Sequence, residues 1–284
     1  RLRIPDDYFT LSQSLAYQYY NLNNYYTGLF PFGDGSSNNL SYTVALSRNN
    51  TFTNPIFPLG GSEFVLSARF SLPYSLWNGV DYANLGDLEK FQDDDGNPDP
   101  AKIEQEKFKW LEFYKIKFKG SWYTRLFDKL VLRTHTEFGF LGAFNNDRGV
   151  IPFDRFFLGG DGMSQYAMDG RETISLRGYP NQSLSSQDGS TIYNRFSLEL
   201  RYPITLKPAA SIFGLTFMET GQGYNSFREF NPFNGKRSVG LGLRIFMPAF
   251  GLLGIDFGYG LDSVNEFNLE PNGWETHFVI GQQF

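Results

Sequence analysis

The stretch Arg195–Ile204, which reads RFSLELRYPI, alternates between two kinds of side chain. Every second residue is apolar or aromatic: Phe196, Leu198, Leu200, Tyr202 and Ile204. The residues between them are polar or charged: Arg195, Ser197, Glu199 and Arg201. Because successive side chains of a β-strand point to opposite faces, this period of two predicts a strand with one apolar and one charged face.

The same alternation recurs along the chain and predicts about ten strands, each near the roughly 9–11 residues that cross a tilted bilayer. Five precede a glycine-rich interruption: 11–19, 40–46, 64–72, 109–123 and 132–140. Five follow it: 196–204, 211–220, 238–247, 253–261 and 276–284. Short and long connections alternate, as do the periplasmic turns and outer loops of outer-membrane barrels. The sequence therefore favours an all-β fold, a transmembrane antiparallel β-barrel, over a soluble β-sandwich with an aromatic core.

Composition agrees with a barrel and narrows the partners. Aromatic residues make up 18% of the 284 residues, yet the mean hydropathy is -0.35. The sequence has no run of about 18 apolar residues that would form a membrane helix. The lack of cysteine excludes disulfides and thiolate metal sites. A net charge of -5 argues against a nucleic-acid partner, which would need a basic face.

Two long connections interrupt the strands. Residues 76–106 form a polar insertion, which we expect in an outer loop. Residues 145–189 contain the stretch Phe156–Tyr179, FFLGGDGMSQYAMDGRETISLRGY, which ends in the run LRGY. Since the short turns are expected on the periplasmic side, the second connection begins on the outer side. We expect it to fold inward into a barrel formed by residues 1–284.

Several motifs after residue 154 occur in a particular order. They are Arg155–Gly160, Leu176–Tyr179, Ser197–Pro203, Phe217–Gly221, Ser238–Pro248, Gly251–Gly260 and Phe278–Phe284. In this order they resemble the sixth outer loop, with its Arg-Gly-aromatic tip, and the following strands of the BamA family of outer-membrane β-barrel assembly factors. Glu219 stands where that family more often has Asp. Glu is the longer of the two acids and would serve in the same role. The resemblance is close from Arg155 onward and looser before it.

The resemblance implies that the chain is the C-terminal ten strands of a sixteen-stranded barrel. A sheet with bare edges cannot lie in lipid, so the first six strands would lie outside this chain or come from a separate chain. The resemblance also implies periplasmic POTRA domains, which, like those strands, would belong to the same polypeptide or to another. A natural ten-stranded barrel is the less favoured alternative.

The resemblance also implies a location in the cell outer membrane and a role in inserting and folding client β-barrel proteins through a lateral seam. The implied partners are unfolded outer-membrane protein clients, accessory lipoproteins of the assembly complex, and outer-membrane lipids with lipopolysaccharide. No cofactor and no enzymatic activity are expected. A related protein-secretion transporter and a passive pore remain alternatives.

The loop tip Arg177-Gly178-Tyr179 is the candidate functional site, which we call the latch. A guanidinium inside a barrel must be paired, and Glu199 and Glu219 lie on the predicted inward faces of the next two strands. Either carboxylate can accept the planar fork of Arg177. Glycine at position 178 permits close approach of the backbone to the wall. In the family, such a contact holds the barrel in its working shape.

The last strand is the second candidate site. Phe278, Ile280 and Phe284 share one parity, which we expect to face lipid, while Gly281 weakens strand pairing. In the family, the last strand meets the first at a weak seam. Opening of that seam would let a client strand pair with the exposed edge. The terminal Phe284 is also explained as a targeting signal of this protein itself.

Two weaker sites compete with these. His135 and Glu137 are two residues apart and share a strand face, but no nucleophile motif accompanies them, so a solvated wall is favoured over a hydrolase. An acidic run has the spacing of a calcium loop, with ligand candidates Asp93, Asp95, Asn97, Asp99 and Glu104. Pro98 occupies the position at which an EF-hand needs Gly, which favours a solvated acidic loop without metal.

Overall fold

Ten strands form one antiparallel sheet in the computed structural model, which describes residues 6–25, 32–51, 54–163, 171–264 and 270–281. Each strand pairs with its neighbours along the sheet: β1 (Phe9–Leu22), β2 (Gly35–Asn49), β3 (Gly61–Ser71), β4 (Tyr114–Phe127), β5 (Leu130–Gly142), β8 (Ile192–Lys207), β9 (Ala210–Tyr224), β10 (Lys236–Met247), β11 (Gly251–Gly260) and β12 (Gly273–Gly281). Two further strands, β6 (Phe156–Leu158) and β7 (Glu172–Ile174), pair in parallel outside this sheet. The predicted all-β antiparallel fold is confirmed.

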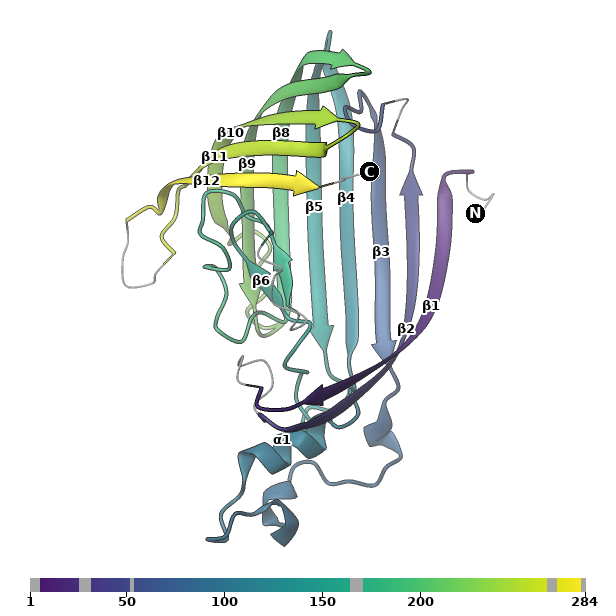
Figure 1. Ribbon diagram of the computed structural model, residues 1–284, viewed down its shortest axis with the longest axis vertical. Helices are drawn as coiled ribbons and strands as arrows, with labels where there is room; N and C mark the ends of the chain where they lie inside the picture. The colour runs from purple at the N-terminus through teal and green to yellow at the C-terminus, as the bar shows by residue number, and fades with distance from the viewer. Residues whose placement is uncertain (1–5, 26–31, 52–53, 164–170, 265–269, 282–284) are drawn as a thin grey trace.

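The sheet is a partial barrel. It curves strongly, and the segment that carries β6 lies on its concave side (Figure 1). The edge strands are β1 and β12, and within the described residues no pairing joins them. The strand order follows the sequence throughout, apart from the excursion through β6 and β7.

Short turns lie at one end of the sheet and long connections at the other. Residues 128–129 join β4 to β5, and residues 208–209 join β8 to β9. The connections 72–113 and 143–191 lie at the opposite end, beyond which α1 projects in Figure 1. This is the alternation that the sequence predicts, and it places the insertion and the glycine-rich connection at the same end.

The insertion between β3 and β4 is more ordered than the polar loop that we expected. It contains η1 (Tyr74–Leu76), η2 (Leu85–Asp87), η3 (Glu89–Phe91) and α1 (Pro100–Phe108). The Oδ1 atom of Asp99 accepts the backbone N–H groups of Ala101 and Lys102, and Pro100 occupies the first turn. A capping Asp followed by Pro is a strong start signal for a helix.

A buried ion pair joins the insertion to the glycine-rich connection. The Nη1 atom of Arg148 lies 2.6 Å from Oε2 of Glu112, and both side chains are almost fully buried. The backbone N–H and the hydroxyl of Ser75 donate to the same carboxylate at 2.8 and 2.7 Å. The two long connections are therefore held together beyond the strand ends.

Of the helices in the described residues, none is long and apolar enough to cross a membrane.

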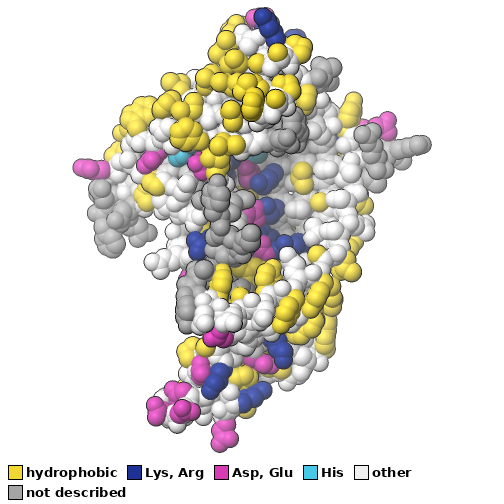
Figure 2. Space-filling view, viewed as in Figure 1, with side chains coloured by type: hydrophobic (Ala, Val, Ile, Leu, Met, Phe, Trp, Pro, Cys, Tyr) yellow, Lys and Arg dark blue, Asp and Glu magenta, His cyan; other side chains and the backbone are white. Residues whose placement is uncertain are grey.

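The two faces of the sheet have the burial expected of a membrane barrel. Large apolar side chains are exposed on the outer face, among them Leu66, Ile116, Leu198, Ile204, Met218, Leu241 and Phe257. Charged side chains are buried on the inner face: Glu137, Arg195, Glu199, Glu219, Arg244 and Asp256. Figure 2 shows charged side chains in the central hollow and hydrophobic ones over the upper strands. Since soluble monomers rarely expose such a large apolar surface, the outer face suits hydrocarbon.

Candidate functional site

The connection between β5 and β8 is fixed against the concave face by a hydrophobic core that it shares with β5, β8 and the insertion. Phe156 of β6 and Ile174 of β7 are both buried in it. Gly160 and Leu176 exchange two backbone hydrogen bonds of 3.1 Å, and Leu176 is fully buried. The backbone that leads to Arg177 is therefore ordered before it reaches the opposite wall.

The guanidinium of Arg177 lies among three carboxylates from three strands. Its Nη2 donates to Oε1 of Glu199 at 2.8 Å and to Oε1 of Glu219 at 2.5 Å. Its Nη1 donates to Oδ2 of Asp256 at 3.3 Å, and its backbone N–H donates to Oε2 of Glu219 at 2.9 Å. The guanidinium also lies over the ring of Phe217, 3.7 Å from the centroid. Only a planar cation with several N–H groups can make this set of contacts.

Gly178 brings the loop backbone against the backbone of β11. Its φ is +88°, and a Cβ there would lie 2.9 Å from the nitrogen of Gly260. A Cβ on Gly258 would lie 2.6 Å from the nitrogen of Gly178. The N–H of Gly178 donates to Nε2 of His277 at 2.9 Å, and its carbonyl accepts from Nδ2 of Asn272 at 2.9 Å. Glycine is required on both sides of this contact because no side chain fits between them.

Tyr179 completes the latch at the start of β10. Its side chain is fully buried, and its hydroxyl donates to the backbone carbonyl of Arg237 at 2.6 Å. The same hydroxyl accepts the backbone N–H of Asp262 at 3.3 Å. The three latch residues thus contact β8, β9, β10 and β11, together with His277 of β12.

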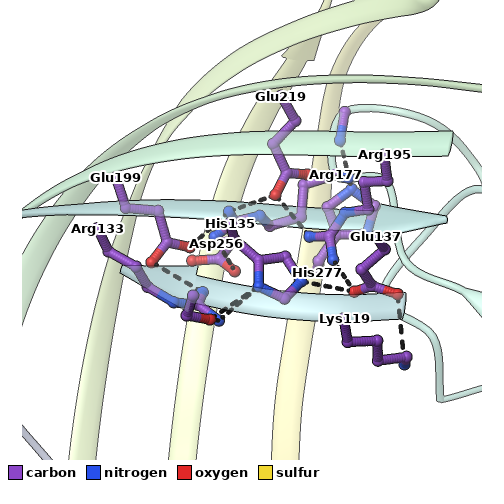
Figure 3. Close-up of polar contacts among 12 residues, drawn as sticks. Lys119, Arg133, His135, Glu137, Arg177, Arg195, Glu199, Glu219, Asp256 and His277 are labelled. Atoms are coloured by element: carbon purple, nitrogen blue, oxygen red, sulfur yellow. Dashed lines mark hydrogen bonds and ion pairs between the residues drawn. The ribbon is translucent and has the colours of Figure 1, made fainter. Parts of the chain in front are cut away.

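The carboxylates around the latch each have at least two cationic partners, and Figure 3 shows those of Glu219 and Glu137. Glu219 accepts from Nη2 of Arg195 at 2.7 Å in addition to Arg177. Asp256 is bound by both terminal nitrogens of Arg244, at 2.7 and 2.6 Å. An uncompensated buried ion costs several kcal/mol, so this pairing is what allows the charges to be buried. The remaining pairs are Glu199 with Arg133 and Arg201, and Glu137 with Lys119 and Arg195.

A second contact joins the connection to β3 and β4. Glu172, the first residue of β7, lies 2.8 Å from the Nζ of Lys115 and also binds Lys117. Asp154 pairs with Lys115 at 3.2 Å and with Arg69. Lys115, Lys117 and Lys119 alternate with apolar residues along β4, but this alternation does not identify their partners. The partners of Lys115 and Lys117 lie on the glycine-rich connection itself.

The structure brings together the residues proposed for the latch and adds others to them. Arg177 lies against both Glu199 and Glu219, the two acids that inward parity selects. Asp256 and His277 were not assigned to the latch from the sequence. The alternation of their strands does predict that both side chains point inward. Asp256 lies opposite the apolar residues of its strand, and His277 lies opposite Phe278 and Ile280. Nothing in the sequence indicates which part of β11 and β12 the loop tip would reach.

His135 takes part in a trio that the sequence does not reveal. Ser121 Oγ lies 2.8 Å from Nδ1 of His135, and Nε2 of His135 lies 2.7 Å from Oε1 of Glu137. A Ser–His–acid chain is the arrangement that nucleophilic catalysis uses. Here Arg133 also donates to Ser121 Oγ at 3.0 Å, Arg195 binds Glu137 at 3.0 Å, and Ser121 is 2% exposed. The trio is engaged in the ion-pair network of the wall.

The last strand lies at the edge of the sheet. Phe278 and Ile280 are 53% and 68% exposed on the outer face. Gly281 is the last residue of β12, and Phe284 lies outside the described residues. Within the described part of the chain, β12 pairs with β11 alone, so its other edge carries unpaired backbone groups.

The acidic run in the insertion makes local contacts. Asp93 Oδ1 accepts the backbone N–H groups of Asp95 and Asn97 at 3.0 and 2.8 Å, and Asp99 caps α1, which contains Glu104. In the described ranges, no three or more His, Cys, Asp or Glu side chains gather in a way that could hold a metal. The carboxylates act as a turn former and a helix cap.

Comparison with known proteins adds a family and a fold. A family model described as the Omp85 superfamily domain matches residues 2–284. A similar solved structure is the crystal structure of BamA from Haemophilus ducreyi lacking POTRA domains 1-3, with a TM-score of 0.62 and 18% sequence identity. The match covers 97% of this chain and 51% of that one, so the chain spans about half the length of that structure. A search of curated proteins found no match.

Proposed function

Because the chain belongs to the Omp85 superfamily, we propose that it forms part of an outer-membrane barrel that inserts and folds client β-barrel proteins. The observation that carries the proposal is the loop tip seated in the wall. Arg177 bonds to carboxylates of β8, β9 and β11, and Gly178 packs on the backbone of β11. A loop held this way stabilises one shape of the barrel interior without performing chemistry.

The edge of β12 supports a role for a lateral seam. Unpaired N–H and C=O groups on an edge strand are a template for another strand. A client segment can add to that edge by β-augmentation, in which main-chain hydrogen bonds give affinity. Lipid cannot satisfy backbone groups, so pairing and burial of the client's own strands drive insertion without a nucleotide. Phe278 and Ile280 on the outer face would contact lipid beside the entering strand.

The proposed partners follow from the two surfaces. The exposed apolar face of the sheet would contact outer-membrane lipids and lipopolysaccharide. Unfolded outer-membrane proteins would be the clients at the seam, and accessory lipoproteins of an assembly complex would bind outside the lipid-facing belt. The location proposed for the protein is the outer membrane.

Reconstitution of the full protein in liposomes tests this function. We expect it to speed the folding of an added client β-barrel protein, measured by the protease resistance of that client. Arg177→Ala should reduce that rate, whereas Arg125→Ala, which removes an exposed arginine at the end of β4, should not. An unchanged client folding rate on adding the unmodified protein would refute the proposal.

A passive pore and a protein-secretion transporter are the alternative functions. The bonds of Arg177 place a closed, charged network in the interior, which favours assembly or secretion over free diffusion. A steady conductance of the isolated protein in planar bilayers would favour the pore. Release of one dedicated partner, without insertion of several client barrels, would favour the transporter.

A further inference from the structure

The latch is one end of a short segment whose other end is held by a different wall. Glu172 and Arg177 are five residues apart in sequence. Glu172 bonds to Lys115 and Lys117 of β4, while Arg177 bonds to β8, β9 and β11. At about 3.3 Å per residue, an extended segment of this length measures about 16 Å. The segment therefore crosses the concave side of the sheet from one wall to another.

The backbone of this segment is hydrogen-bonded along its length. The N–H of Glu172 donates to the carbonyl of Arg155 at 3.0 Å, and the carbonyl of Ile174 accepts from Gly159 at 3.0 Å. Leu176 makes a two-bond bridge with Gly160. The side chains of Ile174 and Leu176 are 2% and 0% exposed. A paired and buried backbone can neither coil nor stretch easily, so the distance between its two ends is fixed.

The charges at its two ends match the two walls. The inner face of β3 and β4 is basic, with Arg69, Lys115 and Lys117, and the acid of the segment lies there. The inner face around β8, β9 and β11 supplies the three carboxylates that bind the arginine of the segment. The opposite direction would place the arginine of the segment beside Arg69, Lys115 and Lys117, and this repulsion between like charges disfavours it.

We propose that Glu172–Arg177 is a brace of fixed length that sets the separation of the β4 wall from the β11 wall. The purpose of the brace rests on the proposed function. It limits the width of the barrel interior while a client inserts. Glu172, Lys115 and Lys117 act as positioning residues in this brace. They do not touch a client. They act by holding the latch in its position.

Spin-label distances test the brace directly. The chain has no cysteine, so Ile116→Cys on β4 and Phe257→Cys on β11 provide two unique labelling sites on exposed apolar positions. The distance between the labels is measured by pulsed electron paramagnetic resonance in lipid nanodiscs, without client. One glycine inserted after Ser175 should lengthen the mean distance by about 3 Å, the rise of one strand residue, or broaden the distance distribution by a similar amount. The same insertion after Asn78, in an exposed turn of the insertion, should leave it unchanged.

Charge exchange tests the Glu172 end without changing length. Glu172→Lys should broaden the distance distribution, because it places a third cation beside Lys115 and Lys117. Adding Lys117→Glu to that variant should narrow it again. Glu229→Lys, the same reversal at an exposed position outside the brace, serves as the control. If both the insertion and Glu172→Lys leave the distance distribution as in the unmodified protein, the brace is refuted.

The distance result and the client-folding result are independent. If the protein fails to fold clients but these variants change the label distance, the brace is supported and the proposed function is refuted. A protein that folds clients while its label distance stays constant in every variant keeps the function and loses the brace.

Discussion

The Arg177 end and the Glu172 end of the brace are held in different ways. At Arg177, a planar cation with 5% exposure bonds to three carboxylates, and the next residue packs backbone on backbone. At Glu172, whose side chain is 22% exposed, two flexible lysines supply the partners. No glycine contact of the Gly178 kind accompanies Glu172 among the described residues.

The difference concerns how much movement each end tolerates. A guanidinium fork fixes both distance and angle, whereas a lysine ammonium is a point charge on a flexible stem. Partial exposure also lets water and salt compete at Glu172. We therefore expect the brace to give way first at Glu172 and last at Arg177.

Glu219→Ala should have the largest effect, a loss of about 3–5 kcal/mol in the free energy of unfolding, typical of breaking a buried ion pair on one side. It removes the acceptor of Arg177 and of Arg195 together. Urea denaturation in detergent micelles, followed by tryptophan fluorescence, measures it. A loss no greater than that of Glu172→Ala would show that the Arg177 end is not the more strongly held one.

Gly258→Ala should come next, with a loss of about 1–3 kcal/mol from overpacking. Its Cβ would lie 2.6 Å from the nitrogen of Gly178, so the loop tip must withdraw. Gly214→Ala is the matched control, because the nearest atom to its Cβ is 4.0 Å away. Trypsin cleavage of the glycine-rich connection should accelerate in the first variant only. Equal cleavage rates would show that close backbone contact is not what holds the tip.

Glu172→Ala should cost about 1 kcal/mol or less, as expected for a partly exposed ion pair. The cost should shrink further in 1 M salt, where the Debye length falls to about 3 Å. The cost of Glu219→Ala should change little over the same range, because its partners are buried. Denaturation of both variants at low and high salt checks this. A salt response of the same size at both ends would remove the distinction between them.

The smallest effect is expected outside both ends, at the cap of α1. The backbone N–H of Lys102 lowers the pKa of Asp99 below its ordinary value of 3.8. The capping contribution is therefore present at neutral pH and is lost as pH falls through the lowered pKa. Asp99→Ala should reduce hydrogen-exchange protection of α1 at pH 7, and the reduction should shrink progressively as pH is lowered through and below 3.8. An effect on the label distance across the brace would show that the insertion is coupled to the barrel interior.

Alternation and loop lengths were sufficient to predict the strands, because both depend on local sequence. The choice of Glu199 and Glu219 as partners of Arg177 needed only inward parity and the family resemblance. The contacts of Asp256 and His277 with the latch could not be predicted in this way, because they depend on the curvature of the sheet. The partners of Lys115 and Lys117 were missed for the same reason. A contact between Glu172 and β4 depends on the path of the chain between them, which periodicity does not describe.

The insertion was a further miss, and its cause is visible in the sequence. Asp99 before Pro100 is a start signal for a helix, and it predicts α1 from capping alone. The same acidic run also has calcium-loop spacing, which predicts a loop, and the two local signals conflict.

The two hydrogen bonds on Gly178 bear on how the last strand finds its place. His277 accepts from the N–H of Gly178, and Asn272, just before β12, donates to its carbonyl. A slip of β12 by one residue against β11 would turn His277 to the lipid face and bring an outward-facing neighbour inward. Gly178 would then lose its acceptor in a buried contact. The seated loop tip thus favours the observed register of β12 over a slip of one residue in either direction.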